Sequence, residues 1–366
     1  MAKLILRKLG VPGTLLLATL LGHVLGHAEL QYTNGQTPLR LKEKPPDAPE
    51  EWKRLVGIYG TGPQAWLLLE HDQKLFRHMD APGSAGDAPV TILGDRALRI
   101  ETGTDNNPGT VTYEREAAEV TKLIVNGVAL QRADAGTNAA NFFHVTLKRP
   151  LEEIRAEAMK AKPPLEPGPF RKPRLIQVAK LDSGIHLDIR YAQSTNFLGA
   201  PVYTQAQAYL QRPAAKALLR ALRELRPLGY GLLIHDAYRP WYVTKIFWDA
   251  TPGKDRIFVA DPQKGSKHNR GCAVDLTLYD LSTGKAVEMP GLYDEMSPRS
   301  FPEFPGGTSL QRWHRNLLRQ AMEKEGFKVD QNEWWHFDYQ DWKHYPILNL
   351  SFEVLAKAQL KETEIQ

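Results

Sequence analysis

The chain has 366 residues, a formal net charge of +5 and a sequence pI near 9.0. Its 42% hydrophobic and 24% charged residues are ordinary for a globular protein, and its length allows two domains. Lys and Arg are spread along the chain without a basic run interleaved with aromatic residues, which argues against nucleic-acid binding. A single cysteine, Cys272, excludes an intramolecular disulfide bond.

Residues 1–28 have the pattern of a secretory signal peptide. Basic residues make the start positive, an apolar run covers residues 9–25, and the small residues of 26–28 stand where a signal peptidase cleaves. The apolar run is short and interrupted by Gly and Pro, which favours cleavage over a retained membrane anchor. We therefore expect an exported protein, periplasmic or otherwise extracytoplasmic, that is not integral to a membrane after the signal is removed.

A polar tether and a β-rich domain are expected next. Residues 29–50 contain Pro45-Pro46 and show no hydrophobic periodicity, whereas residues 51–148 show short apolar or alternating runs between turn residues. Asn126-Gly127 separates two such runs, which strongly indicates a hairpin. We expect a small all-β domain, built as a sheet, sandwich or half-barrel, whose partner the sequence does not name. The expected strands are 65–70, 97–100, 110–113, 123–125 and 128–130.

Residues 149–173 indicate a Pro-rich linker. A charged, helix-permissive stretch at 151–162 comes first, and the prolines between 163 and 169 then favour an extended spacer. The second domain is expected over residues 174–366.

Two amphipathic helices are expected in this second domain. One starts with Pro213 in its first turn and runs to about Leu225. The other starts at Thr308, where Gln311 completes a capping box, and ends at Gly326. Helices that alternate with short strands predict an α+β domain in which a small antiparallel sheet is flanked by helices. Residues expected on the buried faces are Leu218, Leu222 and Leu225 in the first helix and Leu310, Trp313, Leu317 and Ala321 in the second.

Two short clusters in this domain carry residues suited to metal chemistry. Residues 266–275 contain His268 and Asp275, and Glu333 and His336 follow further along the chain. Two imidazoles, a carboxylate and a spare glutamate are the components of a catalytic zinc site that keeps one position open for water. Either cluster alone is commonly structural, but their combination favours a metal site. Strand alternation directs Cys272 away from Asp275, so we expect a buried filler there and not a metal ligand.

These motifs resemble the zinc D-alanyl-D-alanine dipeptidases (VanX type) and their carboxypeptidase relatives. Residues 266–275 have the pattern Ser-x-His-x-x-Gly-x-Ala-x-Asp, and Glu333-x-x-His336 follows. Two further segments, 186–199 and 229–240, are similar to the family's opening segment and to its arginine-bearing strand. The resemblance covers residues from about 175 to 355, and the order of four motifs makes it specific.

The resemblance implies roles for five residues of the reaction centre. His268, Asp275 and His336 would bind one Zn²⁺ ion, and Glu333 would act as general base and then as general acid. Arg239 would stabilise the oxyanion, since a guanidinium stays charged and offers a fixed fork of donors. A structural ion pair is the alternative role for Arg239.

The resemblance also implies three substrate-binding residues. Tyr191 and Ser266 would line the pocket, although the Ser266 hydroxyl could instead close its own turn. Asp294 stands where the family has an aspartate that binds the free ammonium group of a dipeptide, which would select dipeptides over longer acylated chains. The sequence departs from the family at Met289-Pro290-Gly291, so the neighbouring Glu295, or a solvated acidic loop, remains an alternative.

The function expected from these features is zinc-dependent hydrolysis of D-alanyl-D-alanine to two D-alanines. A D,D-carboxypeptidase that trims longer cell-wall peptides is the nearest alternative, and it would need no ammonium pocket. A wall-binding module on an inactive zinc fold is disfavoured by the presence of Glu333 and Arg239. A ligand-binding role centred on the N-terminal β domain is the last alternative. A His₂Asp site also accepts divalent ions other than zinc.

Overall fold

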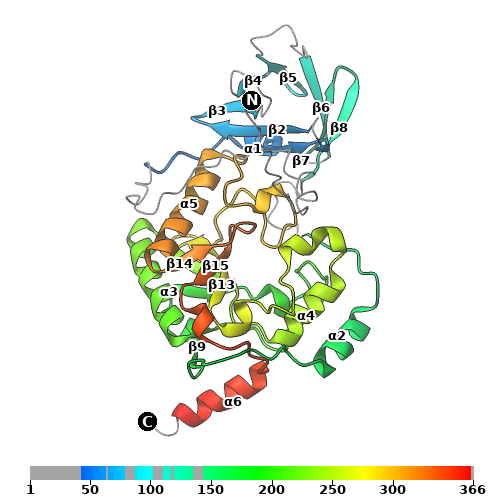
Figure 1. The fold of residues 1–366 in the computed structure, drawn as a ribbon. Coiled ribbons are helices and arrows are strands. Elements are labelled where there is room, and N and C mark those ends of the chain that lie inside the picture. Colours follow the sequence, from blue (N-terminus) through cyan, green and yellow to red (C-terminus); the bar gives the residue numbers. More distant parts are fainter. Residues whose placement is uncertain are drawn as a thin grey trace, which may run out of the picture.

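The structure is a computed structural model that describes residues 43–62, 65–78, 87–101, 110–116, 119–134 and 143–363. The expected signal peptide and residues 29–42 of the expected tether lie outside these ranges. A barrel-like N-terminal sheet stands on an α+β unit that carries the motifs (Figure 1). Within the described ranges, no helix has the length and apolar character needed to cross a membrane.

Eight consecutive strands form the N-terminal sheet, and each pairs antiparallel with the next. Gly60 N donates to Gln131 O and Ala133 N donates to Ile58 O, which joins the first strand to the end of the last. The sheet therefore closes on itself, where a sheet, sandwich or half-barrel was expected. The strands are β1 (Gly57–Tyr59), β2 (Trp66–His71), β3 (Lys74–His78), β4 (Ala88–Ile92), β5 (Ala97–Ile100), β6 (Thr110–Glu116), β7 (Glu119–Val125) and β8 (Val128–Gln131).

The interior of this sheet is a packed apolar core. Leu68, Leu98, Val111 and Leu123 come from four different strands and are fully buried. The predicted hairpin is present, with φ angles of 50° at Asn126 and 80° at Gly127 between β7 and β8.

The prediction of β structure from residue 51 is wrong at its start. Residues Glu50–Leu55 form helix α1, with acidic residues in the first turn and basic residues in the last. This charge order favours a helix because it complements the helix dipole.

The second sheet has five strands in the order β10-β12-β13-β15-β14. Three of the four strand pairings are antiparallel, but β10 pairs parallel with β12, so the expected antiparallel sheet is a mixed one. The crossover helix α3 lies between β10 and β12 in the chain and lets the second strand run in the same direction as the first. The strands are β10 (Ile185–Leu187), β12 (Tyr230–Asp236), β13 (Ala273–Asp280), β14 (Phe327–Val329) and β15 (His336–Tyr339), with β9 (Leu175–Gln177) and β11 (Tyr209–Gln211) pairing separately.

Helices flank the second sheet on both sides. Helices α3 and α5 lie along one side of it, and α4 and α2 lie on the other (Figure 1). Helix α3 has Pro213 in its first turn and buries Leu218, Leu222 and Leu225 as predicted. The helices are α2 (Leu151–Lys160), α3 (Arg212–Leu225), α4 (Trp241–Ala250), α5 (Ser309–Lys324) and α6 (Phe352–Thr363).

Helix α5 begins with the predicted capping box. Gln311 N donates to the Thr308 hydroxyl at 3.2 Å, and Thr308 N donates to Gln311 Oε1 at 2.9 Å. The buried face differs in part from the predicted stripe, because the first turns of α5 pack polar groups against the barrel side. Leu317 and Ala321 are buried as expected, whereas Leu310 and Trp313 are only half-buried.

The expected linker packs on the second unit. Residues 161–174 contain no helix or strand, as expected of a spacer. Glu166 nevertheless pairs with Arg270 and accepts from Ile347 N, and helix α2 buries Ile154 and Ala158 in the core of the second unit. The domain boundaries themselves stay predictions.

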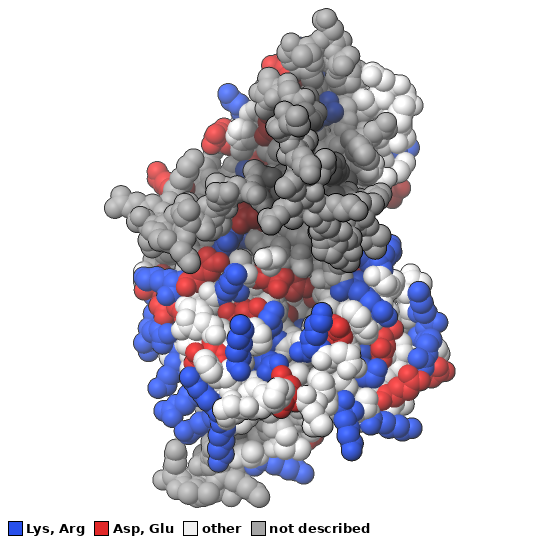
Figure 2. All heavy atoms as spheres, viewed as in Figure 1, with Lys and Arg blue, Asp and Glu red and all other residues white. Residues whose placement is uncertain are grey.

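Charges of both signs are interspersed on the face of the second unit that Figure 2 shows. Lys and Arg side chains stand among Asp and Glu side chains and do not gather into one continuous basic patch on this face.

Candidate active site

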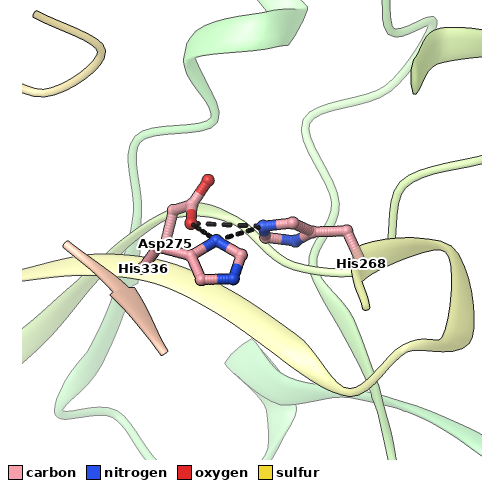
Figure 3. A group of neighbouring side chains, drawn as sticks. All are labelled: His268, Asp275 and His336. Atoms are coloured by element: carbon pink, nitrogen blue, oxygen red, sulfur yellow. Dashed lines mark hydrogen bonds and ion pairs between the residues drawn. The ribbon is translucent and has the colours of Figure 1, made fainter. Parts of the chain in front are cut away.

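Three predicted metal ligands converge in the centre of the second unit (Figure 3). His268 Nε2 lies 3.0 Å from His336 Nδ1 and 3.2 Å from Asp275 Oδ1. His336 Nδ1 lies 3.0 Å from the same Asp275 oxygen. All three side chains are buried.

The sheet explains why two of these residues meet. Asp275 on β13 pairs directly with His336, the first residue of β15, so adjacent strands present the two side chains together. His268 reaches the same point from a short 3₁₀ turn, His268–Arg270, that precedes β13. Gly271 ends this turn with a φ of 65°, and a Cβ there would come within 2.4 Å of Leu175 Cδ2. Glycine is therefore required at this position.

Each imidazole is oriented by a partner behind it. His268 Nδ1 donates to Ala237 O at 2.6 Å, and His336 Nε2 donates to Asp338 Oδ1 at 2.8 Å. These donations leave the lone pairs of His268 Nε2 and His336 Nδ1 facing Asp275. Metal-binding histidines characteristically have such second partners.

This donor set fits a zinc ion. Zinc in proteins is tetrahedral with bonds of about 2.0–2.2 Å to imidazole nitrogen and carboxylate oxygen, so its ligand atoms lie roughly 3.3 Å apart. The three ligand atoms are separated by 3.0, 3.0 and 3.2 Å, close to the edges of such a tetrahedron. Three protein ligands leave the fourth position of the tetrahedron for water or substrate.

Glu333 lies beside the ligand cluster. Its Oε2 is 3.7 Å from His336 Nδ1, and the turn through Trp334 and Trp335 carries the chain from Glu333 to His336, as the sequence predicts. Burial raises the pKa of the Glu333 carboxyl well above its usual range, and Asp275 and Asp330 raise it further against the opposing effect of His336. A carboxyl group with a raised pKa is better suited to accept a proton and to return it near neutral pH.

Arg239 is held by a buried carboxylate. Its Nε donates to Asp236 Oδ2 at 2.9 Å, and its Nη2 lies 2.8 Å from the same oxygen and 3.6 Å from Asp275 Oδ2. Asp236 also accepts from the Tyr203 hydroxyl at 2.7 Å and from Ala237 N at 2.8 Å. Burial by itself lowers the pKa of the Arg239 guanidinium, but Asp236 together with Tyr191, Tyr203 and Asp275 outweighs burial and raises that pKa well above its usual value. Arg239 therefore combines a structural ion pair with a position at the pocket wall.

A cavity of about 180 Å³ brings the predicted site residues together. Its wall includes all three ligands, Glu333 and Arg239, and the three predicted substrate-binding residues. The Ser266 hydroxyl accepts from His268 N at 3.2 Å. Ser266 therefore closes its own turn, the alternative role considered for it, and also lines the cavity. Apolar side chains that complete the wall are Phe197, Phe247, Phe258, Met296 and Trp335.

The cavity wall includes the buried carboxyl group of Asp294. The Tyr191 hydroxyl donates to Asp294 Oδ1 at 3.0 Å. Asp294 Oδ2 is buried and has no hydrogen-bond partner among the described residues. Burial, with a contribution from Asp275, raises the pKa of this carboxyl to about 8. Glu295, the alternative candidate, also lines the cavity, but it uses its carboxylate to accept from Leu292 N and Ser297 Oγ.

The sequence prediction assigned no role to several residues of the site. Asp236 holds Arg239, Tyr293 donates to Asp275 Oδ2 at 3.2 Å, and Asp338 orients His336. Asp338 could have been found from its spacing, because residues two apart on a strand share a face. Cys272 is fully buried in the core and lies outside the ligand cluster, as predicted.

Substitution of Asp338 by Asn is expected to weaken metal binding by about 10–100-fold, the usual effect of losing a carboxylate behind a metal-bound histidine. The amide keeps the size of the side chain but removes the negative charge that polarises His336. Competition against a chelator of known affinity measures the change. Asp341→Asn is the control, because Asp341 lies nearby and pairs with Arg171 at the surface. Equal affinity in both variants would contradict the assignment.

Comparisons with known proteins agree with these motifs. Residues 171–354, half of the chain, match the peptidase M15 family described as D-ala-D-ala dipeptidase. The D-alanyl-D-alanine dipeptidase of Escherichia coli (strain K12) is 34% identical over 174 residues, which are 48% of this chain and 89% of that protein. Those of Enterococcus faecalis and Streptomyces coelicolor are each 35% identical, over 47% and 46% of this chain and 93% and 92% of their own lengths. The chain therefore belongs to the D-Ala-D-Ala dipeptidase family of peptidases.

Proposed function

We propose that this peptidase is a zinc-dependent dipeptidase that hydrolyses free D-alanyl-D-alanine to two D-alanines. The observation that carries the proposal is the buried, unpartnered Oδ2 of Asp294 in the wall of the cavity that holds the ligand cluster. Burial raises the pKa of the Asp294 carboxyl to about 8, so a cationic group in the pocket would stabilise the charged form that burial disfavours. The free ammonium group of a dipeptide is such a cation.

The residues of the chain divide the chemistry among them. Glu333, 3.7 Å from His336 Nδ1, takes the proton from the attacking water and returns it to the leaving amine. Arg239, positioned by Asp236, donates to the oxygen on which negative charge develops. Asp294 and Tyr191 hold the ammonium end of the substrate. Zinc bound by His268, Asp275 and His336 would polarise the scissile carbonyl and lower the pKa of water at the site.

The D,D-carboxypeptidase alternative is less well supported. An acylated peptide has no ammonium group, so it would leave Oδ2 of Asp294 buried and without a partner. We retain, as a proposal, the inference from residues 1–28 that the enzyme acts outside the cytoplasm.

Replacement of Asp294 by Asn is expected to raise KM for free D-Ala-D-Ala by about 10–100-fold, since a charge-assisted contact to a buried group is lost. Cleavage of N-acetyl-D-Ala-D-Ala, low in the unmodified enzyme, should not decrease. D-Alanine release from both substrates measures the effect, with Asp249→Asn on the outer side of α4 as the control. A preference of the unmodified enzyme for the acylated substrate would instead assign the carboxypeptidase function.

A further inference from the structure

The loop that carries Asp294 has little regular structure of its own. It connects β13 to α5 and contains only a short 3₁₀ turn, Pro298–Ser300. Asp294 adopts a left-handed φ of 58°, which is uncommon outside glycine although aspartate tolerates it better than most residues. The position of the Asp294 carboxylate therefore depends on what holds this loop.

The loop is wound around a buried arginine, Arg299. Its Nε donates to Pro290 O at 2.9 Å, and its Nη1 lies 3.6 Å from Glu295 Oε1. A Cβ at Gly291 would come within 2.6 Å of Arg299 O, so the two ends of this turn are in close contact. Glu295 directly follows Asp294, and its carboxylate accepts from Leu292 N at 2.9 Å in addition to its contact with Arg299. Residues on both sides of Asp294 are therefore linked, through Glu295, to the Arg299 side chain.

The barrel supplies a counter-charge to the same arginine. Asp134, just beyond β8, places Oδ1 3.6 Å from Arg299 Nη1, and its side chain is only 1% exposed. Arg132 Nε donates to Asp134 at 2.6 Å and Ile58 N donates to it at 2.7 Å, so barrel groups fix the carboxylate. Burial alone raises the pKa of Asp134, but Arg132 and Arg299 outweigh burial and lower that pKa below its usual range. A buried chain of charges thus runs from Arg132 through Asp134 and Arg299 to Glu295.

The barrel also holds the other end of the loop. Leu67 and Leu69 on the outer side of β2 pack against Phe304 of the loop. Glu70, buried on the same strand, accepts from Ser309 N at 2.7 Å at the start of α5, and its own N donates to Gly307 O at 3.2 Å. The Glu70 carboxylate thereby satisfies one N–H of the α5 N-terminus, Ser309 N, that the capping box does not use.

We propose that the N-terminal barrel is a specificity element of the dipeptidase, in which Asp134 acts through Arg299 and Glu295 as a positioning residue for the ammonium-binding carboxylate of Asp294. This inference rests on the function proposed above. The barrel then contributes to substrate selection, because its residues hold the loop whose Asp294 binds the ammonium group of a free dipeptide.

The test compares Asp134→Asn with the unmodified full-length, zinc-loaded enzyme. The amide keeps the shape of the side chain and removes its charge. We expect KM for D-Ala-D-Ala to rise about tenfold, the size typical of residues that act on a site through others, while kcat changes less than about twofold. Cleavage of N-acetyl-D-Ala-D-Ala, measured at high enzyme concentration, should stay unchanged, because it requires Glu333 but not the ammonium contact. Asp95→Asn, at an exposed barrel position paired with Arg115, is the matched control and should leave both substrates unaffected.

The outcomes separate positioning from simple destabilisation. Loss of folded protein lowers kcat for both substrates by one factor and leaves KM unchanged, and that pattern would overturn the proposal. If Asp134→Asn does not fold, Leu69→Ala, which loosens the contact with Phe304 without exposing a charge, must give the same rise in KM. If the unmodified enzyme cleaves D-Ala-D-Ala and the variants have an unchanged KM, this inference alone is refuted. An unmodified enzyme that cleaves neither substrate would refute the proposed function itself.

Discussion

Substitution of Glu333 by Gln is expected to lower kcat for D-Ala-D-Ala by about 10²–10⁴-fold, the range assigned to a positioned general base. Glutamine has nearly the same size but cannot accept a proton, and Glu333 lies beside the ligand cluster without being one of the three ligands. Its raised pKa, caused first by burial, suits a group that must also return the proton. Initial rates of D-alanine release measure kcat and KM.

Two controls make this result specific. Metal content and KM should remain close to those of the unmodified enzyme, because Glu333 is not one of the three ligands that converge in the structure. Glu224→Gln, an exposed helix residue paired with Lys324, should leave kcat unchanged. Near-normal turnover by Glu333→Gln would show that another group moves the proton.

Replacement of Arg239 by Lys should lower kcat by about 10²–10³-fold, as expected when a donor to a developing oxyanion is lost. The guanidinium contacts Asp236 through two nitrogens and still lies 3.6 Å from Asp275. A lysine ammonium is a single point charge, so it can satisfy the buried Asp236 only by leaving the position from which Arg239 would reach the substrate. KM should change little, because the interaction strengthens as the oxyanion forms.

Thermal unfolding distinguishes the two roles considered for Arg239. Asp236 keeps its bonds from Tyr203 and Ala237 N, so the Lys variant should remain folded. Arg220→Lys, an exposed ion-paired position, is the matched control and should affect neither property. A lowered Tm with unchanged kcat would mean that Arg239 serves only as a structural ion pair.

The parts of the site that were predictable depend on short-range rules. Strand alternation places Asp275 on the face opposite Cys272, and a turn of two residues, Trp334 and Trp335, separates Glu333 from His336. The capping box at Thr308 is likewise a local pattern, and the structure confirms it. The family resemblance added Arg239 and Asp294, whose places in the cavity wall no local pattern predicts.

The features that were missed depend on contacts between distant segments. Barrel closure joins Ile58 and Gly60 to residues that follow β8, and the parallel pairing of β10 with β12 requires a helix between them. The contact between Asp134 and Arg299 links residues on different structural units, and neither residue lies in a recognisable motif. Such pairs become visible only when the tertiary structure is known.

We propose that one zinc ion at His268, Asp275 and His336 makes this chain a dipeptidase, and adding zinc back to the metal-free enzyme tests this most directly. D-Alanine release from free D-Ala-D-Ala is followed during the titration. We expect no turnover without metal, a linear rise as zinc is added, and a plateau at one ion per chain. Turnover by the metal-free chain, or none at the plateau, would contradict it.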